Sequence, residues 1–183
     1  MRRLLRLAFA LLAGLLALQG TYAAGMTWLD LRTEGPDVAA QRQFWSDKLQ
    51  QAQRQWESGR PASRTLPAFV LVQTLSGRTS SVLVSLLFDM FDCELPGNGA
   101  GADLYARCPM RILIGGSPTV RTVERTCLLY VPSAPPDRHG QSQGPDPAQN
   151  RTLVSMDNGT LRLRVVQYGR PVPACDADIP LER

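Results

Sequence analysis

The chain has 183 residues, with 20 lysines and arginines against 16 aspartates and glutamates, which gives a formal net charge of +4. Three of the arginines, Arg2, Arg3 and Arg6, lie in the first 23 residues, which contain no acid. Without that segment the remaining 17 basic and 16 acidic residues leave a net charge of +1. A charge this small does not indicate binding to nucleic acid or to an anionic membrane. The remainder of the chain is long enough for one domain with its own core.

The first 23 residues have the pattern of an export signal. Arginines at the start precede an apolar run over Leu7–Leu18, and the small residues Thr21 and Ala23 stand at the two positions that a signal peptidase reads. The run is shorter than the roughly 20 residues that cross a bilayer. We therefore expect cleavage after Ala23, a periplasmic or secreted location, and no stable membrane insertion of the mature chain. An uncleaved signal anchor is the alternative.

Pro36–Ser58 is predicted to form one long helix. Pro36 suits the first helical position, and Gly59 and Pro61 end the segment. Apolar residues at helical spacing form one stripe: Val38, Trp45, Leu49, Ala52 and Trp56. We interpret Trp45 and Trp56 as anchors that hold the helix on a sheet, and the alternative is that they form a face that binds a partner.

After the helix, the period of the apolar residues becomes twofold. Ala68–Leu75 and Thr79–Phe91 are predicted to form a hairpin around Ser76-Gly77, with Met90 on the core face of the second strand. Met110–Ile114 and Arg121–Val131 are predicted to be two further strands.

The most secure element is a hairpin over Thr152–Asp157 and Thr160–Tyr168. These segments flank Asn158-Gly159, the strongest short signal for a two-residue hairpin turn. The turn would pair Val154 with Leu163 on one largely apolar face, which is the register that the hydrophobic pattern requires. The tail, Arg170–Arg183, is predicted to lie along the surface, held by Cys175.

These elements predict an α+β fold, with an N-terminal amphipathic helix packed on one antiparallel sheet of about six strands. We expect a single domain over residues 24–183. Glu94–Arg107 is rich in glycine and is predicted to be a loop. Residues 133–150 are polar and rich in proline, and are predicted to form a flexible loop.

Four cysteines in an exported chain predict two disulfides. Of the three pairings, we favour Cys93 with Cys108, which closes the glycine-rich loop, and Cys127 with Cys175, which tethers the tail. A zinc site or a redox-active pair would need closely spaced cysteines such as Cys-x-x-Cys, which this chain lacks. We expect neither a metal nor a cofactor.

Little in the chain indicates catalysis. The single histidine, His139, lies in the predicted flexible loop, which does not favour a mechanism with a histidine base. Carboxylates that could perform acid–base chemistry gather near the start of the glycine-rich loop: Asp89, Asp92, Glu94 and Asp103.

The sequence therefore favours a non-enzymatic periplasmic protein that binds another protein. We expect a binding or inhibitor protein, such as an immunity-type protein that neutralises a toxin or hydrolase. The alternatives are an accessory subunit of an envelope secretion or conjugation machine, and a hydrolase that uses carboxylates without histidine. The candidate partner-binding residues, which include a predicted arginine patch for an acidic partner, are Glu94, Asn98, Asp103, Tyr105, Arg162, Arg164, Trp45 and Trp56.

Overall fold

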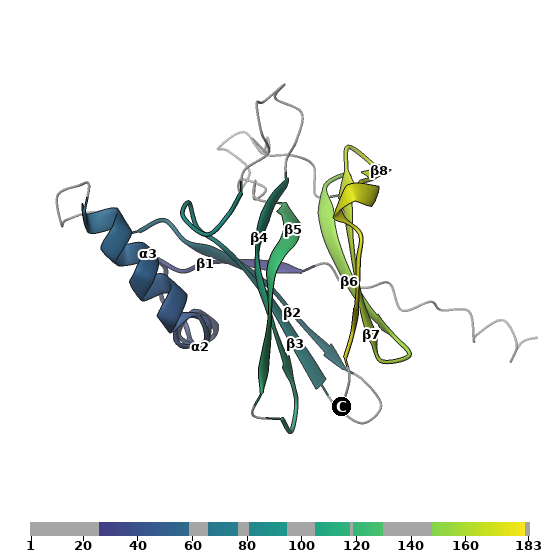
Figure 1. The fold of residues 1–183 in the computed structure, drawn as a ribbon, viewed down its shortest axis with the longest axis horizontal. Helices are drawn as coiled ribbons and strands as arrows, with labels where there is room; N and C mark the ends of the chain where they lie inside the picture. Colours follow the sequence, from purple (N-terminus) through teal and green to yellow (C-terminus); the bar gives the residue numbers. More distant parts are fainter. Residues whose placement is uncertain are drawn as a thin grey trace, which may run out of the picture.

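A computed structural model describes residues 26–58, 66–76, 81–94, 105–117, 119–129 and 148–181. The expected export signal, Asn98, Asp103, His139 and most of the two predicted loops lie outside these residues. No helix in the described ranges is long and apolar enough to cross a membrane. Over these ranges the fold is α+β, with two α-helices, a five-stranded sheet and a four-stranded sheet (Figure 1).

The five-stranded sheet is antiparallel, in the order β1-β2-β3-β4-β5. Its strands are Thr27–Asp30, Phe69–Ser76, Ser81–Phe88, Tyr105–Ile114 and Val120–Leu129. The first predicted hairpin is confirmed, since β2 and β3 pair from Phe69 opposite Phe88 to Ser76 opposite Ser81. The second strand of that hairpin ends earlier than predicted, and Met90 lies in a turn instead of on the core face.

The four-stranded sheet is built around β7. β6 (Arg151–Asp157) and β7 (Thr160–Gln167) form the second predicted hairpin, and its register is confirmed, with Val154 opposite Leu163. Asn158 and Gly159 both have positive φ, at 47° and 76°, as the tight turn requires.

The sequence analysis predicted that the tail lies along the surface, but the tail instead adds strands to the second sheet. It forms β8 (Arg170–Pro171), the 3₁₀ turn η2 (Pro173–Cys175) and β9 (Ala177–Pro180), and both strands pair with β7. The prediction of one sheet of about six strands is therefore wrong. Alternation within each strand indicates which side chains share a face, but it does not indicate which hairpins join the same sheet.

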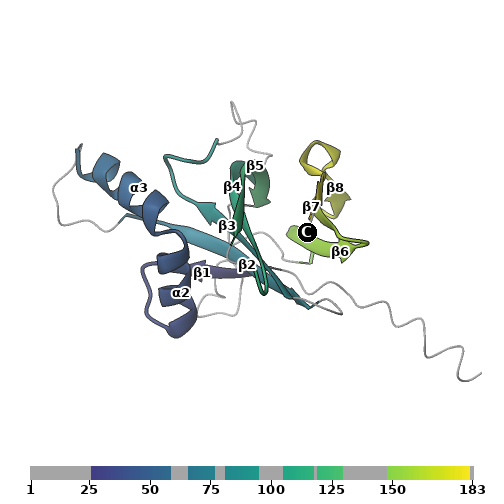
Figure 2. The same cartoon turned by 60° about the horizontal axis from the view of Figure 1, so that its bottom comes forward.

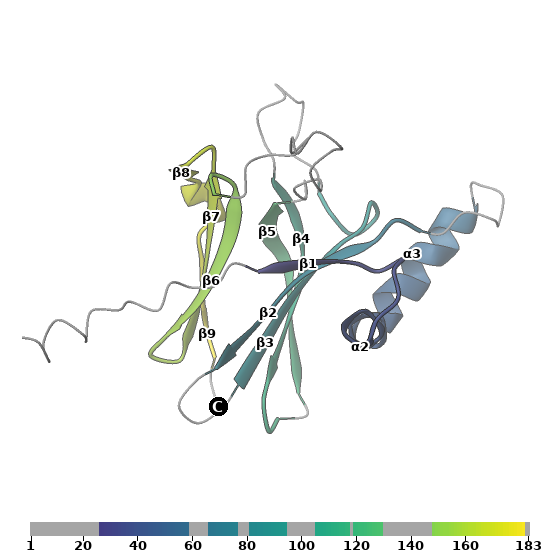
Figure 3. The same ribbon diagram turned by 180° about the vertical axis from the view of Figure 1, so that it is seen from behind.

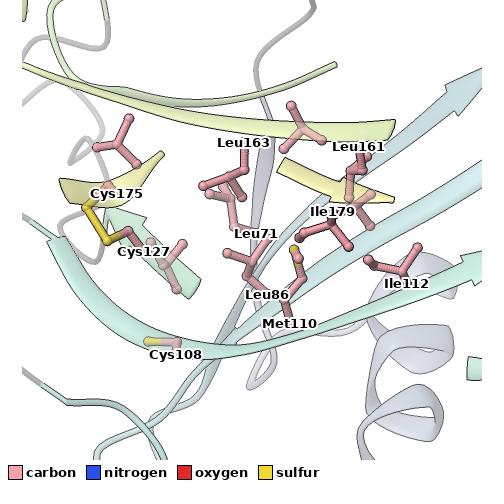
Figure 4. Close-up of a cluster of buried hydrophobic side chains, with 14 of the residues drawn as sticks. Leu71, Leu86, Cys108, Met110, Ile112, Cys127, Leu161, Leu163, Cys175 and Ile179 are labelled. Atoms are coloured by element: carbon pink, nitrogen blue, oxygen red, sulfur yellow. A yellow bond between two sulfur atoms is a disulfide. The ribbon is translucent and has the colours of Figure 1, made fainter. Parts of the chain in front are cut away.

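The two sheets pack face to face, and the helices cover the opposite side of the five-stranded sheet (Figures 1 and 3). We call the larger core the inter-sheet cluster; Figure 4 shows Leu86 and Met110 from the first sheet beside Leu161, Leu163 and Ile179 from the second. The smaller core, the helix-side cluster, contains Leu31, Val38, Trp45, Ala52, Trp56, Leu66, Ala68, Val70 and Leu87.

The predicted long helix is two helices, α2 (Pro36–Phe44) and α3 (Ser46–Ser58), which are separated at Trp45. Arg111 of β4 reaches this break from the sheet. Its guanidinium donates hydrogen bonds to the carbonyl oxygen of Phe44 and to the carboxylate of Asp47, and lies 4.4 Å from the centre of the Trp45 ring. The break thus gives a carbonyl group at the end of α2 a charged partner.

Both predicted disulfides are present. Cys93 and Cys108 have Cα atoms 4.4 Å apart, and Cys127 and Cys175 have Cα atoms 5.2 Å apart. Because Cys127 belongs to β5 and Cys175 to η2, the second bond joins the two sheets beside the inter-sheet cluster (Figure 4).

Removing the disulfide that joins the sheets should cost more stability than removing the other. Cys127 and Cys175 are 48 residues apart and Cys93 and Cys108 are 15 apart, so chain entropy alone gives roughly 4 and 3 kcal/mol. We expect the C127A/C175A variant to lower the free energy of unfolding by the larger amount in urea. Hydrogen exchange should then rise first in β7 and β9, and a faster exchange confined to α2 and α3 would contradict this role.

Arg111→Lys should lower the free energy of unfolding by about 1–3 kcal/mol, because a lysine cannot keep the forked contacts at the helix break and the stacking on Trp45. Arg125→Lys is the matched control. The side chain of Arg125 is 66% exposed, against 13% for Arg111, so its ion pair with Glu94 should contribute under about 1 kcal/mol. Equal losses in the two variants, measured by chemical denaturation, would show that the break does not depend on Arg111.

Candidate functional site

The turn that follows β3, Asp89–Glu94, holds three of the four acids that the sequence analysis placed together, and we call it the acidic turn. Asp89 is fully buried, and its Oδ1 accepts hydrogen bonds from the backbone N–H groups of Phe91 (2.7 Å) and Asp92 (2.8 Å). Burial raises the pKa of Asp89, against the lowering effect of these hydrogen bonds. Asp89 therefore shapes the turn from within the protein.

The rest of the acidic turn is fastened to its neighbours. Lys48 Nζ of α3 lies 3.4 Å from Asp92 Oδ1, and Cys93 is bonded to Cys108 of β4. Glu94 exchanges two backbone hydrogen bonds with Arg107, each 2.9 Å long. The turn is thus held by a helix on one side and by a strand on the other, which fixes its backbone before any partner arrives.

Two large apolar side chains project from this fixed turn. Met90 is 49% exposed and Phe91 is 39% exposed. The other large exposed apolar residues of the described ranges, Val120 and Tyr168, belong to separate elements. Sequence reasoning missed this pair because it continued the alternation of β3 through Met90. The available signal was Asp89, whose side chain can accept hydrogen bonds from the backbone two and three residues later and so ends the strand.

The acids of the turn do not converge on one point. Asp89 bonds the backbone of the turn, Asp92 faces Lys48, and Glu94 Oε1 lies 2.7 Å from Arg125. Within the described ranges, no group of three or more histidine, cysteine, aspartate or glutamate side chains could hold a metal ion. The structure therefore gives these carboxylates separate structural partners.

Arg162 and Arg164 both lie on β7, and each has an acidic partner. Arg162 is 3.0 Å from Asp157, and Arg164 is 2.7 Å from Asp178 and 3.5 Å from Asp176. These pairs are half-exposed, so each contributes little to stability.

Two arginines of β5 are engaged by other groups. Arg121 donates a hydrogen bond to the carbonyl oxygen of Pro180, and Arg125 pairs with Glu94. An acidic partner would have to displace the intramolecular carboxylates to reach Arg125, Arg162 or Arg164.

Trp45 and Trp56 are buried in the helix-side cluster, with 0% and 7% of their surfaces exposed. These positions match the interpretation of both rings as anchors of the helices on the sheet. Tyr105 is half-buried at the start of β4, where it packs against the inter-sheet cluster. The partner-binding role of these three residues stays a prediction.

No family model matches the chain, and the comparisons with curated proteins and with solved structures found no match either.

Asp89→Asn and Asp89→Ala should have different effects on the free energy of unfolding at neutral pH. Because burial raises the pKa of Asp89, this group stabilises the fold below about pH 4 and loses that contribution as the pH rises through its raised pKa. Asparagine keeps an oxygen for both backbone N–H groups and carries no charge. It should therefore match or exceed the wild-type stability at pH 7, and its advantage should shrink toward pH 4.

Asp89→Ala is the contrasting variant, because it leaves the two N–H groups of the turn without their acceptor. It should lower the free energy of unfolding by about 1–3 kcal/mol at both pH values. Urea denaturation at pH 4 and pH 7 measures all three proteins. If asparagine and alanine were equally destabilising at pH 7, the side-chain oxygen would not be the group that holds the turn.

Proposed function

We propose that the protein is an exported binding protein of the inhibitor or immunity type, and that it neutralises a partner through the acidic turn. The observation that carries this proposal is the pair Met90 and Phe91, two exposed apolar side chains on a backbone that is already fixed. Adjacent apolar groups exposed in this way are typical of contact sites between proteins.

The physical advantage of the acidic turn is a low cost of ordering. A partner that buries Met90 and Phe91 gains contact with two large side chains, and little backbone entropy is lost because the turn is already fastened at Asp92 and Cys93. Apolar anchors of this kind often supply most of the binding energy of an interface.

Charged groups surround these anchors in the manner of an interface rim. Lys48 faces Asp92 at 3.4 Å and the largely exposed Glu124 at 4.0 Å, while Glu94 pairs with Arg125 at the far end of the turn. Rim charges of both signs give a partner orientation and specificity more than affinity. Asn98 and Asp103, two of the residues predicted to bind a partner, follow Glu94 in the chain.

The proposed location is the periplasm or the exterior of the cell. All four cysteines form disulfides, which persist in oxidising compartments, and the first 23 residues have the pattern of an export signal. The alternative of an envelope accessory subunit that docks through Trp45 and Trp56 is less well supported, because both rings would have to leave the helix-side cluster to reach a partner.

The test is the double variant M90S/F91S, with V120S/Y168S as the matched control that removes the same kind of exposed apolar surface elsewhere. Each protein is used as bait in a periplasmic extract of its own host, and the captured partner is then purified for affinity measurement. We expect M90S/F91S to weaken binding by roughly 30-fold or more and V120S/Y168S to leave it nearly unchanged.

Both variants should unfold at nearly the wild-type temperature, because the replaced side chains are exposed. A partner that binds M90S/F91S as tightly as the wild type would refute the acidic turn as the contact.

A further inference from the structure

A half-open cavity of about 530 Å³ lies where α2 meets β1, β2 and β3. It is distinct from the acidic turn, because it includes Leu83 near the start of β3, whereas the turn follows the end of that strand. Figure 2 shows α2 beside β1, and residues of both elements line the cavity. Its volume falls within the range of roughly 300–1,000 Å³ that is usual for sites of small ligands.

The cavity has an apolar surface that the helices leave partly uncovered. Leu29, Val72 and Leu83 line it from three adjacent strands, and all three are only half-buried. An aliphatic group that covers them would remove this apolar surface from water, which favours binding.

A buried chain of hydrogen bonds fixes the polar group that Gln41 presents to the cavity. The indole N–H of Trp45 donates to Ser85 Oγ at 2.8 Å, and the Ser85 hydroxyl donates to Gln41 Oε1 at 2.7 Å. Ser85 Oγ accepts from the indole and donates its own proton, and the oxygen of Gln41 is the acceptor at the end of this chain. The amide nitrogen of Gln41, whose side chain lines the cavity, is then left as a donor for a ligand.

The second polar group of the cavity wall is a carboxylate. Asp37 lies in the first turn of α2 and is exposed, and it forms no ion pair with another residue of the described ranges. The cavity thus offers one negative charge, one oriented amide donor and an apolar surface between strands. An anionic ligand would be repelled by Asp37, and a purely apolar one would leave the donor of Gln41 without a partner.

We propose that this cavity binds an organic cation on an aliphatic stem with a carbonyl group nearby, which is the chemistry of a lysine or arginine residue. The cation pairs with Asp37, the stem covers Leu29, Val72 and Leu83, and the carbonyl oxygen accepts a hydrogen bond from Gln41 Nε2. This site is independent of the acidic turn, so its test does not depend on the proposed function.

The test is a titration of the full mature chain, followed by amide NMR, with three matched probes: N-acetyl-arginine methylamide, the uncharged norleucine analogue and the acidic glutamate analogue. We expect the arginine probe to shift amides of β1, α2 and β2 around the cavity, and to leave those of the acidic turn unchanged. The other two probes should bind at least roughly tenfold more weakly, because they lack the charge-assisted contact. Equal binding of the norleucine analogue would overturn the proposal.

A second comparison separates the two sources of this chemistry. A tetrapeptide with arginine at its second position is titrated beside the single-residue probe. Tighter binding of the peptide supports a segment of another protein as the ligand, and equal binding supports a free small molecule. Failure of both to bind overturns the site.

Variants identify the groups that carry recognition. Asp37→Asn should weaken the arginine probe roughly tenfold, whereas Glu57→Gln, which removes an exposed carboxylate from α3, should leave its affinity unchanged. If both variants weakened the arginine probe equally, its binding would reflect the overall charge of the protein, and the proposed site would be refuted.

Gln41→Glu tests the donor. Glutamate keeps an acceptor for Ser85 but offers no amide N–H, so the preference of the wild type for the arginine probe over n-butylguanidinium, which has the same single cation and lacks the carbonyl, should disappear. Persistence of that preference would contradict the role of Gln41. Circular dichroism checks the fold of each variant, and the result with Asp37→Asn stands if Gln41→Glu does not fold.

Discussion

The burial of both faces of β3 is the constraint on which the rest of the structure depends. Val84 and Leu86 face the inter-sheet cluster, while Leu87 faces the helix-side cluster, and all three are fully buried. A strand that is apolar on both sides needs a cover on both sides. The helices provide one and the second sheet the other, so the three layers follow from one central strand, and the Cys127–Cys175 bond holds the outer sheet in its place.

The helix-side cover includes polar groups, and their pairing shapes the surface. Trp45 is fully buried, and its indole N–H donates a hydrogen bond to Ser85, which in turn donates one to Gln41. A buried polar group without a partner would cost about 1–3 kcal/mol, so this chain is a condition of packing the ring there. Gln41, the last member of this chain, also lines the cavity beside α2. Core packing and the chemistry of a surface site are thus parts of one network.

In the acidic turn, too, a buried polar side chain determines what is exposed at the surface. Burial raises the pKa of Asp89, and the buried carboxylate accepts hydrogen bonds from the backbone N–H groups of Phe91 and Asp92. That bonding ends β3 and turns Met90 and Phe91 outward. The proposed binding surface therefore depends on a residue that no partner would touch.

The sequence by itself determined what depends on local pattern. The register of β6 and β7 follows from Asn158-Gly159, and the disulfide pairing present is the one that the sequence favoured among three. It could not determine the break at Trp45, because Arg111, which bonds the broken end, lies far along the chain. Nor could it place β9 beside β7. Those outcomes depend on which distant groups meet, and only the tertiary structure brings together residues that no periodicity relates.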